Sequence, residues 1–212
     1  MTSVLFTSGA TVTFRELIEV ITSYDFIVET IIGNGITRMI VQYGNEIETG
    51  TQKHVSEEFY RQCVEDKELK QLLQLEVVLG SQNDSNVVTY RSNKYRGFEM
   101  VVFPFSNDIG LFISESDVVI SHAGTGSIID TLRLEKPLIV VTNDKLMNKH
   151  QEEVADELVK LGCCRKMTIE DMKLSQLKDC ISEILSGPET FNKLPECSTT
   201  EVEGIIYHEL VK

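Results

Sequence analysis

The sequence predicts an α/β protein with a Rossmann-like, three-layer fold, in which helices cover both faces of a mainly parallel sheet. Short apolar runs recur along the chain, and each is followed by a turn and then by a stretch with helical spacing. Alternating strands and helices are typical of three-layer α/β folds. Several turns between a strand and the next helix are built from glycine and small polar residues, and such turns are where these folds bind nucleotides.

The composition limits the classes of function. The chain has 212 residues, the size of one domain, with 42% hydrophobic and 25% charged residues. A formal net charge of −13 argues against broad binding of nucleic acids or anionic membranes. No apolar run approaches the ~20 residues that span a bilayer, and the N-terminus has no signal-peptide pattern. We therefore expect a cytoplasmic protein without a transmembrane segment of its own.

The cysteines support the same compartment. There are five, an odd number, and no two of them form a C-x-x-C pair. The adjacent Cys163 and Cys164 fall in a predicted strand, where two reduced thiols are more common than a strained bridge. The four histidines have no metal-ligand spacing to the cysteines. We expect reduced cysteines, no metal site and no cofactor.

The predicted elements follow from the apolar periodicity. We expect strands at residues 4–6, 37–42, 98–103, 118–120, 137–141 and 163–167. We expect helices at residues 14–21, 56–79, 107–114, 127–134, 150–161 and 169–186. Thr13 and Glu16 form a capping-box pattern for the first helix, and Ser106 is a candidate cap for the third. We interpret residues 1–190 as one domain, with a less regular insertion at about 46–96, and 191–212 as a tail.

Some inward-facing residues can be named in advance. The helix at 56–79 would bury Phe59, Cys63, Leu69, Leu72, Leu73 and Leu75. The helix at 150–161 would bury Val154, Ala155, Leu158 and Val159. Both lists follow from helical spacing of apolar residues.

The strongest functional signal lies between Ser116 and Ser127. A buried strand ends at Ser121-His122, and Gly124 and Gly126 are expected to turn the chain with positive φ before a helix begins. The free N–H groups at a helix N-terminus bind anions. The same turn is also compatible with a simple tight connection, because it matches neither a G-x-G-x-x-G fingerprint nor a P-loop. His122 is compatible with a structural role too, but its place between strand end and glycines favours a functional one.

Two further segments are predicted to meet this turn at the same edge of the sheet. The first strand ends in Ser8-Gly9-Ala10-Thr11, which is either a phosphate or sugar contact or only a tight turn. The strand at 137–141 leads to Asn143 and, after a polar loop, to His150-Gln151. The carboxyl ends of successive parallel strands place their polar residues together.

Five blocks of sequence together resemble one family. They are FTSGAT at 6–11, VQYG at 41–44, SDVVISHAGTGS at 116–127, KPLIV at 136–140 and the Asn143, Met147, His150-Gln151 set. They are similar to the catalytic subunit of the UDP-N-acetylglucosamine transferase of asparagine-linked glycosylation, in its fungal form. They are more distantly similar to the C-terminal half of the bacterial GlcNAc transferase that completes the lipid-linked peptidoglycan precursor. The resemblance covers most of residues 1–165 outside 46–96.

The resemblance implies the donor-binding half of a glycosyltransferase-B fold that works with a membrane-anchored, acceptor-binding subunit. The pair would add GlcNAc from UDP-GlcNAc to GlcNAc-diphosphodolichol at the cytosolic face of the endoplasmic reticulum. The sugar of the donor is α-linked and the new linkage is β1,4, so the configuration at its anomeric carbon inverts. No metal is expected, because backbone and hydroxyl donors would stabilise the leaving diphosphate.

The resemblance also implies roles for single residues. His122 would contact the diphosphate or the sugar, and Asp130 the ribose hydroxyls, although Asp130 is equally compatible with a solvated helix position. The other donor-binding candidates are Ser8, Gly9, Thr11, Gly124, Thr125, Gly126, Ser127, Asn143, His150 and Gln151. In the tail, Val202, Ile205, Ile206 and Leu210 are candidates for docking the partner. No Asp, Glu or His is placed for the general base, so we expect the partner to supply it.

Two other classes remain open from the sequence. One is a nucleotide-sugar epimerase-like enzyme, which has a similar donor site but normally needs a second domain. The other is a non-catalytic nucleotide-binding or scaffold protein. Replacing His122 by alanine would distinguish a scaffold protein from a transferase, because it should cripple transfer only if the site is catalytic.

Overall fold

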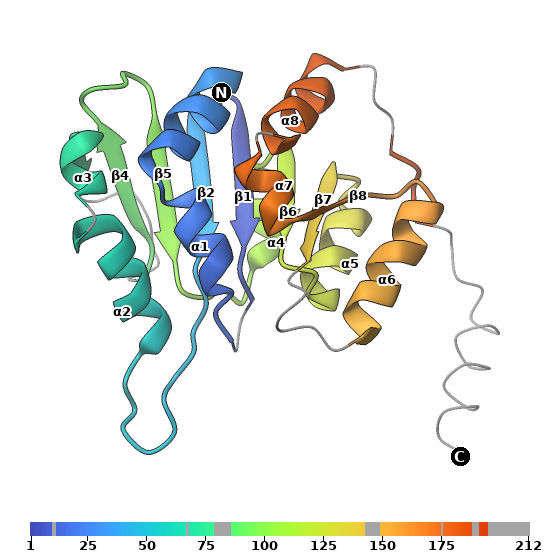
Figure 1. Ribbon diagram of the computed structural model, residues 1–212, viewed down its shortest axis with the longest axis horizontal. Coiled ribbons are helices and arrows are strands. Elements are labelled where there is room, and N and C mark those ends of the chain that lie inside the picture. The colour runs from blue at the N-terminus through green and yellow to red at the C-terminus, as the bar shows by residue number, and fades with distance from the viewer. Residues whose placement is uncertain are drawn as a thin grey trace.

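One sheet of eight strands forms the centre of the molecule (Figure 1). The computed structural model describes residues 1–9, 12–66, 68–78, 86–142, 149–174, 176–187 and 191–194. At residues 66 and 149–151 it describes the backbone but not the side chains. The strands are β1 (Ser3–Thr7), β2 (Arg38–Gln42), β3 (Leu75–Val77), β4 (Val88–Ser92), β5 (Glu99–Phe103), β6 (Val118–Ser121), β7 (Leu138–Thr142) and β8 (Arg165–Thr168). Their order across the sheet is β3-β4-β5-β2-β1-β6-β7-β8.

The first strand lies in the middle of the sheet and pairs in parallel on both sides. Phe6 of β1 lies opposite Val41 of β2 and opposite Ile120 of β6. The strands from β5 to β8 in this order are all parallel. At the other edge, β4 runs in the opposite direction and pairs antiparallel with both β5 and β3. The predicted mainly parallel sheet is therefore confirmed, and the carboxyl ends of β5, β2, β1, β6, β7 and β8 meet at one edge.

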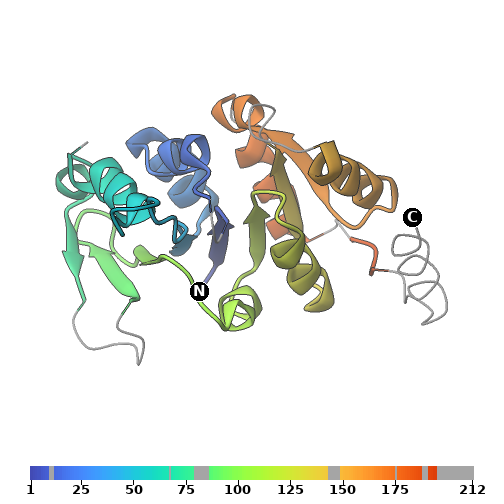
Figure 2. The same cartoon turned by 90° about the horizontal axis from the view of Figure 1, so that it is seen from below.

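Helices cover both faces of this sheet, as Figure 2 shows along a second direction. The helices are α1 (Arg15–Ile21), α2 (Val55–Arg61), α3 (Leu69–Leu72), α4 (Ile109–Ser114), α5 (Thr125–Arg133), α6 (Lys149–Lys160), α7 (Ile169–Lys173) and α8 (Gln176–Ser186). Three shorter helical segments are η1 (Phe26–Ile31), η2 (Ile32–Asn34) and η3 (Gln62–Asp66). η1 and η3 are π-helical and η2 is 3₁₀.

Alternate residues of each strand divide the core into two layers. Val4 and Phe6 of β1 pack with α1, η1 and α8 in the larger apolar cluster. Leu5 packs on the other side with residues of α4, α5 and α6. Every residue of β1, β6 and β7 is buried, as expected for parallel strands covered on both faces.

The predicted helix at 56–79 is wrong beyond Leu72. The helical turns there are interrupted by η3, and the chain then reverses at Gln74, which has a φ of 51°. Leu75 begins β3 instead, and Leu72 is 43% exposed rather than inward. The apolar spacing of this segment fits a helix and a short strand equally well, which is why periodicity alone gave the wrong element. The 46–96 region thus contributes two strands to the common sheet.

The starts of two helices also differ from their predictions. The capping box of Thr13 and Glu16 does not form, because α1 begins at Arg15 and the Thr13 N–H donates to Glu46 Oε2 at 3.2 Å. The third predicted helix begins at Ile109, and the Ser106 hydroxyl instead accepts the Asp108 N–H.

The C-terminal part of the fold also differs from its prediction. The helix at 169–186 is two helices, α7 and α8, and α7 begins with a capping box between Thr168 and Asp171. The last strand begins at Arg165, so Cys163 and Cys164 lie in the buried connection before it. On α6, Ala155 and Leu158 face inward as predicted, but Val154 and Val159 are 37% and 40% exposed.

Candidate functional site

His122 is fixed at the carboxyl edge by the end of the neighbouring strand. Its backbone N–H donates to the Thr7 carbonyl at 3.0 Å, and its ring Nδ1 lies 3.1 Å from the same oxygen. A carbonyl only accepts, so Nδ1 carries the hydrogen and Nε2 presents its lone pair. Two bonds to one acceptor therefore fix both the position and the tautomer of the imidazole.

The ring lies between two glycines that must lack a side chain. A Cβ at Gly124 would lie 2.5 Å from Nε2 and Cε1 of His122, and a Cβ at Gly9 would lie 3.0 Å from Nε2. Such contacts are far inside van der Waals distance. Gly9 and Gly124, which precede helices at the ends of adjacent strands, thus leave the space that the imidazole fills.

The sequence predicts positive φ at Gly124 and Gly126, and this prediction is wrong. Gly124 has a φ of −71°, and Gly126 is the second residue of α5. The left-handed conformation falls on Ala123, with a φ of 68° and a side chain that is 1% exposed. A non-glycine residue in this region costs about 1–3 kcal/mol and is characteristic of functional turns.

The first turn of α5 presents free backbone donors beside His122. The first bond inside this helix is that of the Ile128 N–H to the Gly124 carbonyl at 3.0 Å. The N–H groups of Thr125, Gly126 and Ser127 therefore have no partner within the helix. A Cβ at Gly126 would meet no atom within 4 Å, so the space beside this residue of the first turn is open. The arrangement is suited to an anion, since the helix dipole is positive there.

The electrostatics of His122 favour a neutral ring. Burial lowers the pKa of the imidazole, and the hydrogen bond to the Thr7 carbonyl opposes this only in part. A neutral imidazole with a free Nε2 accepts a hydrogen bond from a hydroxyl. Between the two predicted contacts of His122, its neutral form therefore favours a sugar hydroxyl over a diphosphate oxygen.

Two buried hydroxyls next to His122 were missed by the sequence analysis. Within the described ranges, Thr7 Oγ1 and Ser121 Oγ are buried and have no hydrogen-bond partner. The two residues lie opposite each other in the β1–β6 register, on the sheet face that packs on α4 and α5. Buried hydroxyls without partners are uncommon. In the sequence, the only sign of these two hydroxyls is that two apolar strands each end in a hydroxyl residue.

The other candidate donor-binding residues have different surroundings. The Ser8 hydroxyl donates to the Gln42 carbonyl at 2.9 Å and so joins β1 to β2. Asp130 is half-buried in the second turn of α5, on the same helix as the anion site. Thr11, Asn143 and the tail positions Val202, Ile205, Ile206 and Leu210 lie outside the described residues, as do the side chains of His150 and Gln151.

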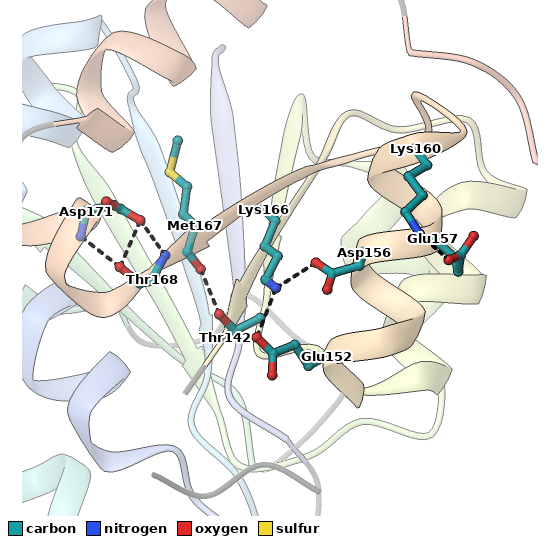
Figure 3. Close-up of polar contacts among 9 residues, drawn as sticks. All are labelled: Thr142, Glu152, Asp156, Glu157, Lys160, Lys166, Met167, Thr168 and Asp171. Atoms are coloured by element: carbon teal, nitrogen blue, oxygen red, sulfur yellow. Dashed lines mark hydrogen bonds and ion pairs between the residues drawn. The ribbon is translucent and has the colours of Figure 1, made fainter. Parts of the chain in front are cut away.

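Lysine 166 holds the start of α6 against the last strand (Figure 3). Its Nζ lies 2.7 Å from Asp156 Oδ1 and 3.2 Å from Glu152 Oε1, both on α6. Burial acts to lower the pKa of Lys166, but the hydrogen bonds to Asp156 and Glu152 prevail and raise it. The first turn of α6, which contains His150 and Gln151, is thereby held near the carboxyl edge.

The described part of the chain has neither a metal-ligand cluster nor a membrane-spanning helix. No group of three or more His, Cys, Asp or Glu side chains there is arranged to hold a metal ion. No helix among those residues is both long and apolar enough to cross a membrane.

Relatives of known function share this sequence along its length. The chain is 98% identical over 212 residues to the UDP-N-acetylglucosamine transferase subunit ALG13 of Debaryomyces hansenii, with 100% of both chains covered. It is 37% identical to the protein of the same name from Candida albicans, with 100% of this chain and 75% of the relative covered. The resemblance expected from the sequence blocks is confirmed.

Solved structures agree with the fold. The solution structure of ALG13 matches with a TM-score of 0.60 and 28% identity, covering 100% of this chain and 98% of the other. The crystal structure of Acinetobacter baumannii MurG matches with a TM-score of 0.50 and 13% identity, covering 86% of this chain and 41% of the other. The predicted fold class, one half of a glycosyltransferase-B fold, is confirmed. The sequence profile of the glycosyltransferase family 28 C-terminal domain matches residues 3–207, and the chain belongs to this family.

Proposed function

We propose that the chain is the donor-binding, catalytic subunit of an inverting glycosyltransferase. It transfers GlcNAc from UDP-GlcNAc to GlcNAc-diphosphodolichol in a β1,4 linkage, in N-glycan precursor synthesis. It acts with a membrane-anchored, acceptor-binding subunit at the cytosolic face of the endoplasmic reticulum. The observation that carries the proposal is the His122 ring held between Gly9 and Gly124 beside the open N-terminus of α5. The name of the 98% identical relative, a transferase subunit, supports the donor and the need for a partner.

The leaving group would rest on the first turn of α5. The N–H groups of Thr125, Gly126 and Ser127 would donate to the diphosphate, and the Ser127 or Thr125 hydroxyl would add a further bond. The charge on this diphosphate grows as the glycosidic bond breaks, so fixed donors stabilise the transition state more than the ground state. We propose that no metal is needed for this step.

The sugar and the ribose would lie on either side of the diphosphate. His122 Nε2 would accept a hydroxyl of the transferred GlcNAc, and Asp130 would accept those of the ribose. The Ser8-Gly9 turn and the segment with Asn143, His150 and Gln151 would close the pocket around the sugar. The general base that deprotonates the acceptor hydroxyl would come from the partner.

The test is kinetic and uses the complex with the membrane subunit. His122→Ala should lower kcat/KM for transfer by at least about 100-fold, because the sugar loses its fixed hydrogen-bond acceptor in the transition state. A matched control is Lys173→Ala, a change of an exposed residue on α7. Unchanged transfer in the His122 variant would contradict a catalytic site and favour a scaffold protein. Release of free UDP with a changed sugar, without an acceptor, would favour an epimerase-like enzyme.

A further inference from the structure

The two buried hydroxyls beside His122 need a partner that the protein chain does not supply. Thr7 Oγ1, at the end of β1, and Ser121 Oγ, at the end of β6, are fully enclosed and make no hydrogen bond within the described ranges. The neighbouring hydroxyl of Ser8, by contrast, donates to the Gln42 carbonyl at 2.9 Å. An enclosed hydroxyl without a partner is destabilising, since it gives up its hydrogen bonds to water. Two such groups side by side therefore indicate one shared partner.

The spacing of the two hydroxyls suits a bridging water. Thr7 and Ser121 lie opposite each other in the parallel register of β1 and β6, which are neighbours in the sheet (Figure 1). Neighbouring strands lie ~4.8 Å apart, and opposed side chains point to the same face of the sheet. A water about 2.8 Å from each hydroxyl oxygen spans this gap. A direct bond between the two hydroxyls would use only one of their two donors.

Such a water would lie under the start of α5. Leu5 and Val119, two residues earlier in the same strands, belong to the same apolar cluster as Ala123 and as Ile128 of α5. Because side chains alternate along a strand, the two hydroxyls point to this face of the sheet as well. Both oxygens are enclosed, so a substrate at the open side of α5 does not reach them. Their partner is therefore a water and not the donor itself.

The turn next to these hydroxyls is strained and has unused donors. Ala123 has a φ of 68° although its side chain is buried, and a residue in this conformation persists only where its surroundings fix it. Within the described part of the chain, the N–H groups of Ala123 and Gly124 make no hydrogen bond. They lie in the chain between Ser121 and the first turn of α5. A buried water makes two to four hydrogen bonds, so one water can join the hydroxyls to this turn.

We propose that Thr7 and Ser121 hold a buried water that fixes the Ala123-Gly124 turn and thereby aims the first N–H groups of α5 at the diphosphate. Both are positioning residues, since neither hydroxyl touches the donor. The proposal rests on the proposed function for the ligand at α5, UDP-GlcNAc. The water site itself depends only on the ends of β1 and β6.

Removal of one hydroxyl tests the water site in the full-length chain. Thr7→Val keeps the shape of the side chain and should lower the midpoint of thermal unfolding by about 2–4 °C, because the water loses a partner. A hydroxyl without any partner predicts the opposite sign, since a methyl group in its place would raise the midpoint. Relaxation dispersion of the water oxygen counts long-lived waters and should find one fewer in the variant. Ser121→Ala removes the other hydroxyl and should give the same two changes.

The matched control is another buried threonine. Thr22, at the end of α1, donates its hydroxyl to the Ile18 carbonyl at 2.6 Å. Thr22→Val therefore removes a hydroxyl that already has a protein partner. This variant should leave the number of long-lived waters unchanged.

Kinetics of the complex with the membrane subunit test the positioning role. Thr7→Val and Ser121→Ala should each raise the KM for UDP-GlcNAc about fivefold, the equivalent of one hydrogen bond. The KM for the lipid-linked acceptor should not change. Thr7→Ser keeps the hydroxyl and should keep the KM of the wild type for UDP-GlcNAc, as should Thr22→Val.

Each outcome decides between the proposals. An unchanged number of long-lived waters in Thr7→Val overturns the water site, and so does a higher midpoint of unfolding. Loss of the water without a change in the KM for UDP-GlcNAc overturns the positioning role, and so does an equal rise of this KM in Thr7→Ser and Thr7→Val. A wild-type complex without transfer activity contradicts the proposed function, whereas the unfolding and relaxation measurements still decide the water site.

Discussion

At the scale of single residues, the site depends on an imidazole that stays neutral. Burial lowers the pKa of His122 below the value of about 6.5 that it has in an unfolded chain. As the pH falls, the unfolded chain takes up this proton before the folded one. The stabilising contribution of the neutral ring is therefore complete above pH ~6.5 and is lost as the pH falls from there through the folded-state pKa.

This predicts a difference in pH dependence between the wild type and His122→Gln. The glutamine amide donates to the Thr7 carbonyl but does not titrate. Between pH 7.5 and 5.5 the wild type should lose about 1 kcal/mol more of its free energy of unfolding than the variant. Urea unfolding at both pH values measures this, and carboxylate titration cancels in the comparison. Equal losses would mean that His122 titrates normally.

Replacing Gly124 or Gly126 by alanine should change the free energy of unfolding in opposite directions. Gly124→Ala puts a methyl group 2.5 Å from the ring and should lower the free energy of unfolding by about 1–3 kcal/mol. Gly126→Ala is the matched control, since its Cβ would enter open space in a helix, where alanine is favoured by about 0.5–1 kcal/mol. Thermal unfolding of both variants checks this. Destabilisation by both, or by neither, would show that the ring does not restrain position 124.

At the scale of elements, α6 is oriented by one side chain of β8. Lys166→Met removes the contacts to Glu152 and Asp156 and keeps the aliphatic stem. Since the side chains of Glu152 and Asp156 are about half exposed, the free energy of unfolding should fall by no more than about 1 kcal/mol. The first turn of α6 should open more often, and the KM for UDP-GlcNAc should rise a few-fold.

Hydrogen exchange of the amides at 152–156 measures the opening directly. Lys160→Met is the control, because it breaks an exposed pair with Glu157 within the same helix and leaves β8 untouched. Faster exchange only in the Lys166 variant is expected. Equal exchange in both variants would mean that α6 is held by its apolar face alone.

The elements differ in how well the sequence could predict them. β1, β6 and β7 were recognised because a strand covered on both faces is continuously apolar. The break at Gln74 is not recognisable in the same way, because Leu69, Leu73 and Leu75 fit a helix by spacing. The strand partner of Leu75 is Ser92 of β4, which is distant in the sequence. The same limit applies to the site: His122 and its glycines were visible as a motif. The contact of Gly9 with the imidazole was not visible, because it depends on β1 and β6 lying side by side in the sheet.

At the scale of the molecule, the end of the described chain is anchored to the folded domain. The last described residues are held at the amino edge of the sheet. The Asn192 amide donates to the Leu161 carbonyl at 2.7 Å, and Lys193 pairs with Glu135 at 2.6 Å. The side chain of Asn192 occupies the space that a Cβ at Gly162 would take. Every strand and helix of the described residues comes before this point.

Deletion of residues 200–212 should therefore separate folding from assembly. The free energy of unfolding should change by less than about 0.5 kcal/mol, because the contacts of Asn192 and Lys193 remain. UDP should bind as before, because the start of α5 is untouched. If Val202, Ile205, Ile206 and Leu210 dock the membrane subunit, the truncated chain should no longer co-purify with it, and transfer should be lost. Replacing only these four residues by serine in the full chain should have the same effect, which excludes an effect of length. Co-purification of both altered chains would assign the interface to the folded domain.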